Sequence, residues 1–194
     1  MTVGMLAEWS VELSAEAPIL EVPWTSDDRQ LRYFDLKRQP ELLLEIPEAC
    51  SYPELAEFLS WANSPDSPLE TAKCDVWTSR DINAEDEIFG EPCKFGSYVD
   101  LLFAGSKRGF SEHEQFVQRL ARMLRQAPEL ASAAEFVVRR LIDHRRPERV
   151  EDFYVTFYLC GYGEDEQEAK KRWAIALTLA QNAMKQYFSS KSRT

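Results

Sequence analysis

The side chains best suited to chemistry lie on three predicted strands, at residues 71–81, 96–104 and 152–160. Successive side chains of a strand point to opposite faces of its sheet, so these strands, if paired, gather one set on each face. One face would hold an apolar set that packs against helices: Val76, Thr78, Val99, Leu101, Phe103, Val155, Phe157 and Leu159. The opposite face would hold a polar and aromatic set: Lys73, Asp75, Trp77, Tyr98, Asp100, Tyr154, Thr156 and Tyr158.

This polar and aromatic set is the main candidate for a functional surface. Tyrosine and tryptophan are favoured where one end of the side chain is dry and the other is wet, which does not describe a plain solvent face. Three interpretations remain open. The set could pack beneath the N-terminal strands, form a homodimer interface, or line a ligand cleft in which Asp75 and Asp100 are paired carboxylates for binding or acid–base chemistry. In the last case Lys73 would hold an anionic group.

A second candidate is an anion site at Lys107 and Arg108, which precede the N-terminus of a predicted helix. Two cations and the free N–H groups of a first helical turn would then point the same way. Ser111 competes for those N–H groups as a cap, and the alternative is a solvent-exposed connection without a ligand. The glycine turn at residues 160–163 is structural, because the acidic residues 164–166 after it would repel a phosphate.

No sequence motif indicates a metal site or an activated nucleophile. The four cysteines (Cys50, Cys74, Cys93 and Cys160) are widely spaced and form no C-x-x-C pair, which favours free thiols in a reducing compartment. The acidic loop at residues 81–91 lacks the register of a calcium loop. Both histidines, His113 and His144, fall at predicted helix ends and are expected at the surface. We predict no catalytic residue, no metal and no cofactor.

The N-terminal third predicts short strands followed by helices. Residues 19–24 and 30–36 flank a polar turn of hairpin length, and residues 7–13 alternate as a further edge strand. Pro40 suits the start of a short helix that Pro47 ends, although residues 42–46 also fit a strand. A second helix follows from Tyr52 up to the proline-containing loop at residues 63–68.

The remainder predicts a strand hairpin, two helices, a strand and a helix. Residues 71–81 and 95–105 are expected to pair, and a helix then begins at Ser111, with Glu114 completing a capping box. Helical spacing predicts a second helix over residues 130–144. Residues 153–160 are apolar on both faces, which is typical of a central strand. The final helix is predicted from one apolar stripe: Ala169, Trp173, Leu177, Ala180, Met184 and Tyr187.

Together these elements predict one α+β domain over residues 1–188, with a disordered tail at 189–194. We expect a mainly antiparallel sheet of about five to seven strands with three or four helices packed largely on one face. The alternative is a ferredoxin-like core with an extra C-terminal helix, which needs residues 42–46 as its first strand.

The net charge and the hydropathy indicate which partners and which classes of function to expect. The net charge of −10 disfavours nucleic acids and anionic membranes as partners, although residues 105–149 hold ten Lys/Arg against six Asp/Glu. No apolar run approaches a membrane span and no secretory signal opens the chain, so we expect a soluble, cytoplasmic protein. We expect it to act without catalysis through protein–protein contact, as a homodimer or with another protein. The alternative is a small-molecule-binding protein or an enzyme that uses the polar and aromatic face.

Overall fold

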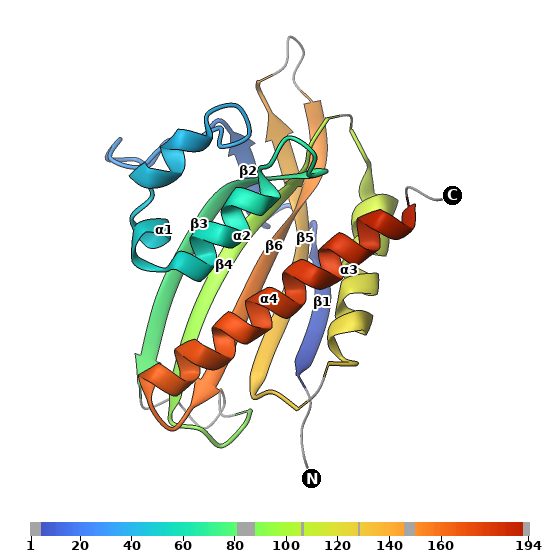
Figure 1. Cartoon of the computed structure of the whole chain (residues 1–194). Helices are drawn as coiled ribbons and strands as arrows, with labels where there is room; N and C mark the ends of the chain where they lie inside the picture. Colours follow the sequence, from blue (N-terminus) through green and yellow to red (C-terminus); the bar gives the residue numbers. More distant parts are fainter. Residues whose placement is uncertain (1–4, 81–87, 106, 128, 146–149, 192–194) are drawn as a thin grey trace.

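The computed structural model describes residues 5–80, 88–105, 107–127, 129–145 and 150–191. Within these ranges the chain forms a mixed six-stranded sheet, and helices α2 (Pro53–Ala62), α3 (Phe110–Leu124) and α4 (Glu166–Lys191) lie on the same side of it (Figure 1). The fold is therefore of the α+β class. We call the helix-covered side of the sheet the first face and the opposite side the second face.

The sheet is antiparallel except at one edge. Strands β3 (Leu69–Arg80), β4 (Cys93–Phe103), β5 (Ser132–Asp143) and β6 (Val150–Gly163) lie in the order β5-β6-β4-β3, with every neighbouring pair antiparallel. The expected β3–β4 hairpin and the central position of β6 are confirmed.

The parallel edge is made by the N-terminal strands. β1 (Leu6–Glu12) pairs with the first part of β5, and β2 (Ile19–Val22) continues along the same edge beside Arg140–Asp143. The expected edge strand at residues 7–13 is thus present, although its partner was not foreseen.

β5 overturns the prediction of a helix over residues 130–144. The residues assigned to a helical stripe are divided between the two faces, because Ala134 and Val138 join the first-face core while Val137 and Leu141 lie on the second face. A strand that is apolar on both faces can match helical spacing by chance. The pairing of β5 with β6 on one side and with β1 and β2 on the other decides in favour of the strand.

The N-terminal hairpin prediction is also wrong. Residues 30–36 form no strand, and the pairing is limited to a single bridge between Thr25 and Arg32. The side chains explain this, because Trp24 and Tyr33 both pack against a small core on the second face. Residues 23–36 therefore cross the second face from the β2 edge to the β3 edge, where the indole N–H of Trp24 donates to the Ala72 carbonyl at 2.9 Å.

An ionic cluster fixes the crossing segment at the end of the sheet. The Arg145 guanidinium donates to Glu70 at 2.5 Å and to both carboxylate oxygens of Asp143 at 2.9 Å. It also donates to the Tyr33 hydroxyl at 2.7 Å. Because Glu70 and Asp143 are buried, these bonds offset the cost of removing two carboxylates from water.

Short helices follow the crossing segment. The 3-10 helix η1 (Pro40–Glu45) and α1 (Pro47–Ser51) lead into α2, and each begins with proline at a first-turn position. The expected short helix at Pro40 is present as a 3-10 helix. Residues 42–46 are not a strand, so the ferredoxin-like alternative lacks its first strand.

The start of α3 differs from the predicted capping box. Gly109, with φ of 74°, occupies the N-cap, and no side chain caps the helix. The Ser111 hydroxyl instead accepts a hydrogen bond from the Gln115 amide at 3.2 Å. The N-cap lies two residues earlier than predicted, so Ser111 already lies inside the first turn.

α4 packs with its backbone directly on β6. A Cβ at Gly161 would lie 2.3 Å from both the Ala169 carbonyl oxygen and the Trp173 nitrogen. The Trp173 indole is fully buried and donates to the Ser97 hydroxyl at 2.8 Å. The predicted apolar stripe of this helix is confirmed, since its six members are all buried: Ala169, Trp173, Leu177, Ala180, Met184 and Tyr187.

The C-terminal helix is longer than expected. It continues through residues 189–191, which the sequence placed in a disordered tail, whereas residues 192–194 lie outside the described residues. Within the described chain, no helix combines the length and apolar character that crossing a membrane requires.

The contact between α4 and β6 yields a stability prediction. Gly161→Ala should destabilise the fold by about 3 kcal/mol, because only a shift of the α4 backbone can relieve the overlap. Gly96→Ala is the matched control: the three atoms nearest its Cβ all belong to the Trp77 side chain, at 2.5 to 2.8 Å, and none belongs to the backbone. We expect the control to cost about 1 kcal/mol in urea unfolding at 25 °C. Equal losses in the two variants would contradict the close contact.

Candidate functional site

Strand register brings most of the predicted polar and aromatic set together on the second face. Asp75 pairs with Tyr98, and Tyr98 pairs with Tyr158, so three strands contribute to one row. Asp100 pairs with Thr156 in the next row. The opposite face is the core as expected, with one exception: Val99, Leu101, Val155, Phe157 and Leu159 are buried and Val76 and Phe103 pack against them, whereas Thr78 is exposed.

The second face has a covered half and an open half. The covered half is a small core beneath β2 and the crossing segment, formed by Leu20, Val22, Ala72, Leu102, Leu141 and Tyr154 with Trp24 and Tyr33 against it. In the open half Trp77, Tyr98 and Tyr158 are half-buried, and Asp75 and Glu135 are exposed. The interpretation that the set packs under the N-terminal strands therefore holds for Tyr154. It does not hold for Trp77, Tyr98 and Tyr158, which we call the aromatic row.

A chain of hydrogen bonds joins the two halves. The Thr156 hydroxyl donates to Asp100 Oδ1 at 2.7 Å and accepts from Arg139 Nη1 at 2.7 Å. The same guanidinium donates to Glu12 at 2.7 Å and to the Tyr158 hydroxyl at 3.3 Å. Arg139 was missed as a site residue because the sequence placed it at a helix end, and correct assignment of β5 would have found it.

Burial controls the protonation of this chain. Asp100 is 5% exposed, and burial raises the pKa of its carboxyl to about 6 despite the Thr156 hydrogen bond and the positive charges of Lys73 and Arg139. Burial, followed by the negative charges of Asp100 and Asp75, also raises the pKa of Tyr98. Burial and Asp100 raise the pKa of Tyr154 to about 12.

Asp75 and Asp100 share the second face without forming a hydrogen-bonded pair. Asp75 pairs with Tyr98, and Asp100 follows Tyr98 by two residues on the same strand. Asp75 and Asp100 are therefore diagonal neighbours, whose backbones lie about 7–8 Å apart. Asp75 is exposed and accepts the Val76 N–H at 2.8 Å, whereas Asp100 accepts from Thr156. The two acids therefore sit in different environments, and a ligand between them would meet one wet and one dry carboxyl.

Lys73 faces the covered side of the site. A β-bulge between Thr71 and Cys74 displaces it from the regular pairing, and its ammonium lies over the Trp24 ring at 4.7 Å. Lys73, Trp24 and Phe34 line a cavity of about 270 Å³ along the β3 edge. The sequence could not indicate this cavity, because its walls come from separate parts of the chain: the crossing segment, residues 45–48, Leu59 and β3.

At the loop of Lys107 and Arg108, the N–H groups expected to hold an anion are directed at a carboxylate of the protein itself. The N–H groups of Arg108 and Gly109 donate to the Asp152 carboxylate at 3.1 and 3.2 Å, so a protein anion already binds them. The two cations also diverge. Lys107 lines a cavity beside β5 and β6, whereas Arg108 lines another beside α4 and lies 3.6 Å from Glu112.

The two histidines lie in different surroundings, and two of the cysteines are held in the thiol form. His113 is buried, against expectation, with its Nδ1 2.7 Å from the Gly109 carbonyl oxygen, and His144 is exposed and lies 2.8 Å from Glu21. Burial raises the pKa of Cys74 to about 12 and that of Cys160 to about 11, so both are thiols at neutral pH. Across the described ranges no group of three or more His, Cys, Asp or Glu side chains could hold a metal ion, and residues 81–87 of the acidic loop lie outside those ranges.

Comparisons with models of protein families, with curated proteins and with solved structures gave no match to this chain. The site is therefore interpreted from its own geometry. That geometry offers an aromatic row with both charge signs around it, one dry carboxyl linked to an arginine, and an adjoining apolar cavity.

Asp100 gives a pH-dependent prediction. Its pKa in the folded chain, about 6, exceeds the ordinary value of 3.8, so the folded state binds more protons between these values and loses stability as the pH rises through them. The loss should be about 2 kcal/mol between pH 4 and pH 7. Asp100→Asn should remove it, and should be more stable than the wild type at pH 7, as measured by urea unfolding across this range.

Asp75→Asn is the control, because it removes an exposed carboxylate from the same face. It should retain the wild-type dependence of unfolding free energy on pH. An unchanged pH profile in Asp100→Asn would show that the buried carboxyl does not hold its proton as described.

Proposed function

We propose that the protein acts through protein–protein contact, as a homodimer joined by the open half of the second face, and that this surface performs no reaction. The observation that carries the proposal is the half-exposed aromatic row of Trp77, Tyr98 and Tyr158 on a sheet face that the helices leave uncovered. Aromatic side chains are enriched at the centres of interfaces, where each removes a large area from water at a small entropic cost.

The shape of the surface supports a sheet-on-sheet contact. The Trp77 ring lies across Gly96, where a Cβ would come within 2.5 Å of the indole, so the ring lies close to the strand instead of projecting from it. The Tyr98 and Tyr158 rings are neighbours, with centroids 5.9 Å apart. A ring that lies low on its sheet, as Trp77 does, suits the spacing of about 10 Å at which two sheets pack face to face.

The charges around the row support a second copy as the partner. A two-fold interface brings the same patch from both subunits together, so each charged group must meet its opposite within that patch. Asp75 and Glu135 supply exposed carboxylates, and Lys94, two residues before Gly96 on the same strand face, supplies a half-buried ammonium. The patch thus contains both signs and can be self-complementary, which a surface of one sign cannot.

Trp77→Glu tests this interface. If Trp77 is a central contact, the change should weaken the dimer by about 2 kcal/mol or more, which is about 30-fold in Kd. Light scattering with size-exclusion chromatography at low micromolar concentration should show the wild type at twice 22.4 kDa and the variant at 22.4 kDa.

Ile175→Glu is the matched control, since Ile175 is a 44% exposed apolar residue on α4, across the sheet from the aromatic row. It should remain a dimer. A wild type that is monomeric at every concentration would overturn the homodimer, and equal dissociation of both variants would move the interface elsewhere.

A second candidate function is small-molecule binding in the cavity at the β3 edge. Its walls combine the Trp24 and Phe34 rings with the Lys73 ammonium, which is the usual pattern of an apolar pocket with a few polar groups. Native mass spectrometry of the purified protein should then show an adduct that Lys73→Gln reduces. Lys94→Gln removes a lysine outside this cavity and should leave the adduct intact, and an adduct insensitive to both changes would exclude this cavity.

A further inference from the structure

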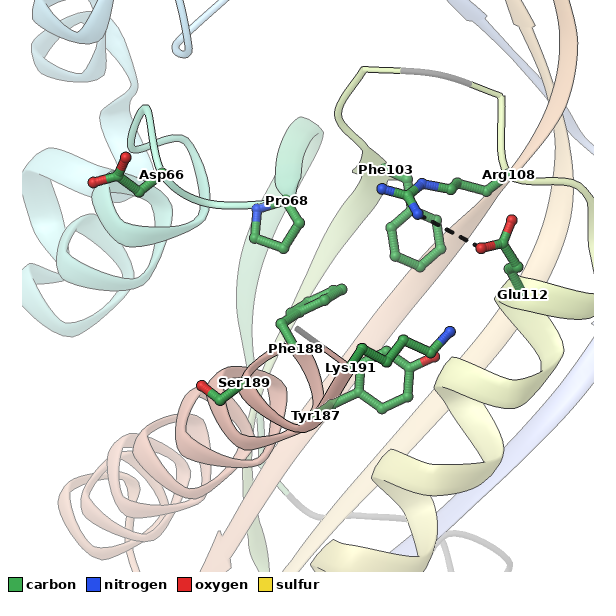
Figure 2. A pocket seen from close by; sticks show the side chains of 9 residues that line it. All are labelled: Asp66, Pro68, Phe103, Arg108, Glu112, Tyr187, Phe188, Ser189 and Lys191. Carbon is green, nitrogen blue, oxygen red and sulfur yellow. Dashed lines mark ion pairs between the residues drawn. The ribbon is translucent and has the colours of Figure 1, made fainter. Parts of the chain in front are cut away.

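A separate cavity of about 470 Å³ lies where the end of α4 meets the start of α3. Figure 2 shows that its lining side chains come from α4, from the end of β4, from the loop before β3 and from the segment entering α3. These elements lie on the first face, so the cavity is across the sheet from the aromatic row and independent of the proposed dimer.

The floor of the cavity is aromatic. Phe103 and Phe188 have ring centroids 6.0 Å apart in an edge-on arrangement, and Tyr187 and Phe188 lie 5.1 Å apart. Pro68 adds a further apolar wall. A flat apolar ligand could therefore replace water against ring faces and edges.

Two cations stand on one rim of this floor. The Arg108 guanidinium lies over the Phe103 ring at 5.7 Å, and the Lys191 ammonium lies over the Tyr187 ring at 5.1 Å. Arg108 also pairs with Glu112, but at 3.6 Å and with both side chains about 40% exposed, which makes the pair weak. Figure 2 places Asp66 at the opposite end with its carboxylate directed away from the cavity.

The Tyr187 hydroxyl provides an independent sign of a missing contact. Tyr187 is 6% exposed, and its hydroxyl oxygen is buried without a hydrogen-bond partner among the described residues. A buried, unpaired hydroxyl costs about 1–3 kcal/mol, so such groups are rarely left without a partner. The hydroxyl lies beside the Lys191 side chain (Figure 2). If a bound anion attracts the Lys191 ammonium, the side chain moves aside and the hydroxyl can donate a hydrogen bond to that anion.

We propose that this cavity binds a small amphipathic anion, namely an aromatic carboxylate whose ring lies on Phe103 and Phe188 and whose carboxylate meets Arg108 and Lys191. An inorganic anion would leave the aromatic floor exposed to water. A neutral aromatic compound would form no ion pair with Arg108 or Lys191. Each charge-assisted contact favours the anion by about tenfold in affinity.

The probe for the test is 2-naphthoate, with neutral 2-naphthalenemethanol as its matched analogue, each titrated into the full chain and followed calorimetrically at neutral pH and low salt. Naphthoate should bind at least tenfold more tightly than the alcohol. Arg108→Gln and Lys191→Gln should each weaken naphthoate about tenfold and leave the alcohol unchanged. Glu112→Gln should strengthen naphthoate, because it frees Arg108 and removes a competing carboxylate.

Two further variants test whether the loss of naphthoate binding reflects a loss of fold stability or only a change in net charge. Tyr187→Phe keeps the ring, so the fold should be at least as stable as the wild type in urea, while naphthoate binding weakens. Lys107→Gln removes one charge from the adjacent loop position but lines a different cavity, and should bind naphthoate like the wild type. The proposal is overturned if naphthoate does not bind at millimolar concentration, if the alcohol binds equally, or if Lys107→Gln matches Arg108→Gln.

Discussion

The direct contact between the backbones of α4 and β6 at Gly161 is the constraint on which the rest of the structure depends. It places the Trp173 indole against Ser97 in the middle of the first face and directs the helix along the sheet. Fourteen and fifteen residues after Trp173, the same helix brings Tyr187 to Phe116 and Phe188 to Phe103. One close approach therefore sets both the main core and the aromatic cavity at its far end, because a helix of 26 residues transmits its direction rigidly.

The segment between β2 and η1 determines what remains of the second face. An antiparallel sheet with helices on one side can leave its other side open to water or to a partner. Here residues 23–36 cover one half through Trp24 and Tyr33, and the Arg145 cluster fixes that crossing to the end of β5. The open half is consequently aromatic and bordered by charge, which is the basis for proposing it as a subunit contact.

The two proposed surfaces lie on opposite sides of one sheet and use different chemistry. The second face offers aromatic rings, with Trp77 lying low on its strand, whereas the cavity at the α4 end offers aromatic rings beneath two cations, suited to a small anion. The Asp100–Thr156–Arg139 chain lies at the border between the covered and open halves. Because burial raises the pKa of the Asp100 carboxyl to about 6, this carboxyl changes its protonation in mildly acidic solution.

The sequence by itself determined the elements whose burial pattern is local: the β3–β4 hairpin, the central strand β6 and the buried stripe of α4. Within each strand it also separated Asp75, Tyr98 and Tyr158 from the apolar set, because strand alternation depends only on neighbouring residues. The strand register then put the three on one face. Only the tertiary structure decided that residues 132–143 are a strand, since apolar positions on both faces also fit a helix and pairing with distant partners made the choice. That pairing and the path of residues 23–36 also decided three other features, which no local spacing encodes. These are the covered half of the second face, the hydrogen bonds of Arg139 in the site, and the separation of Lys107 from Arg108.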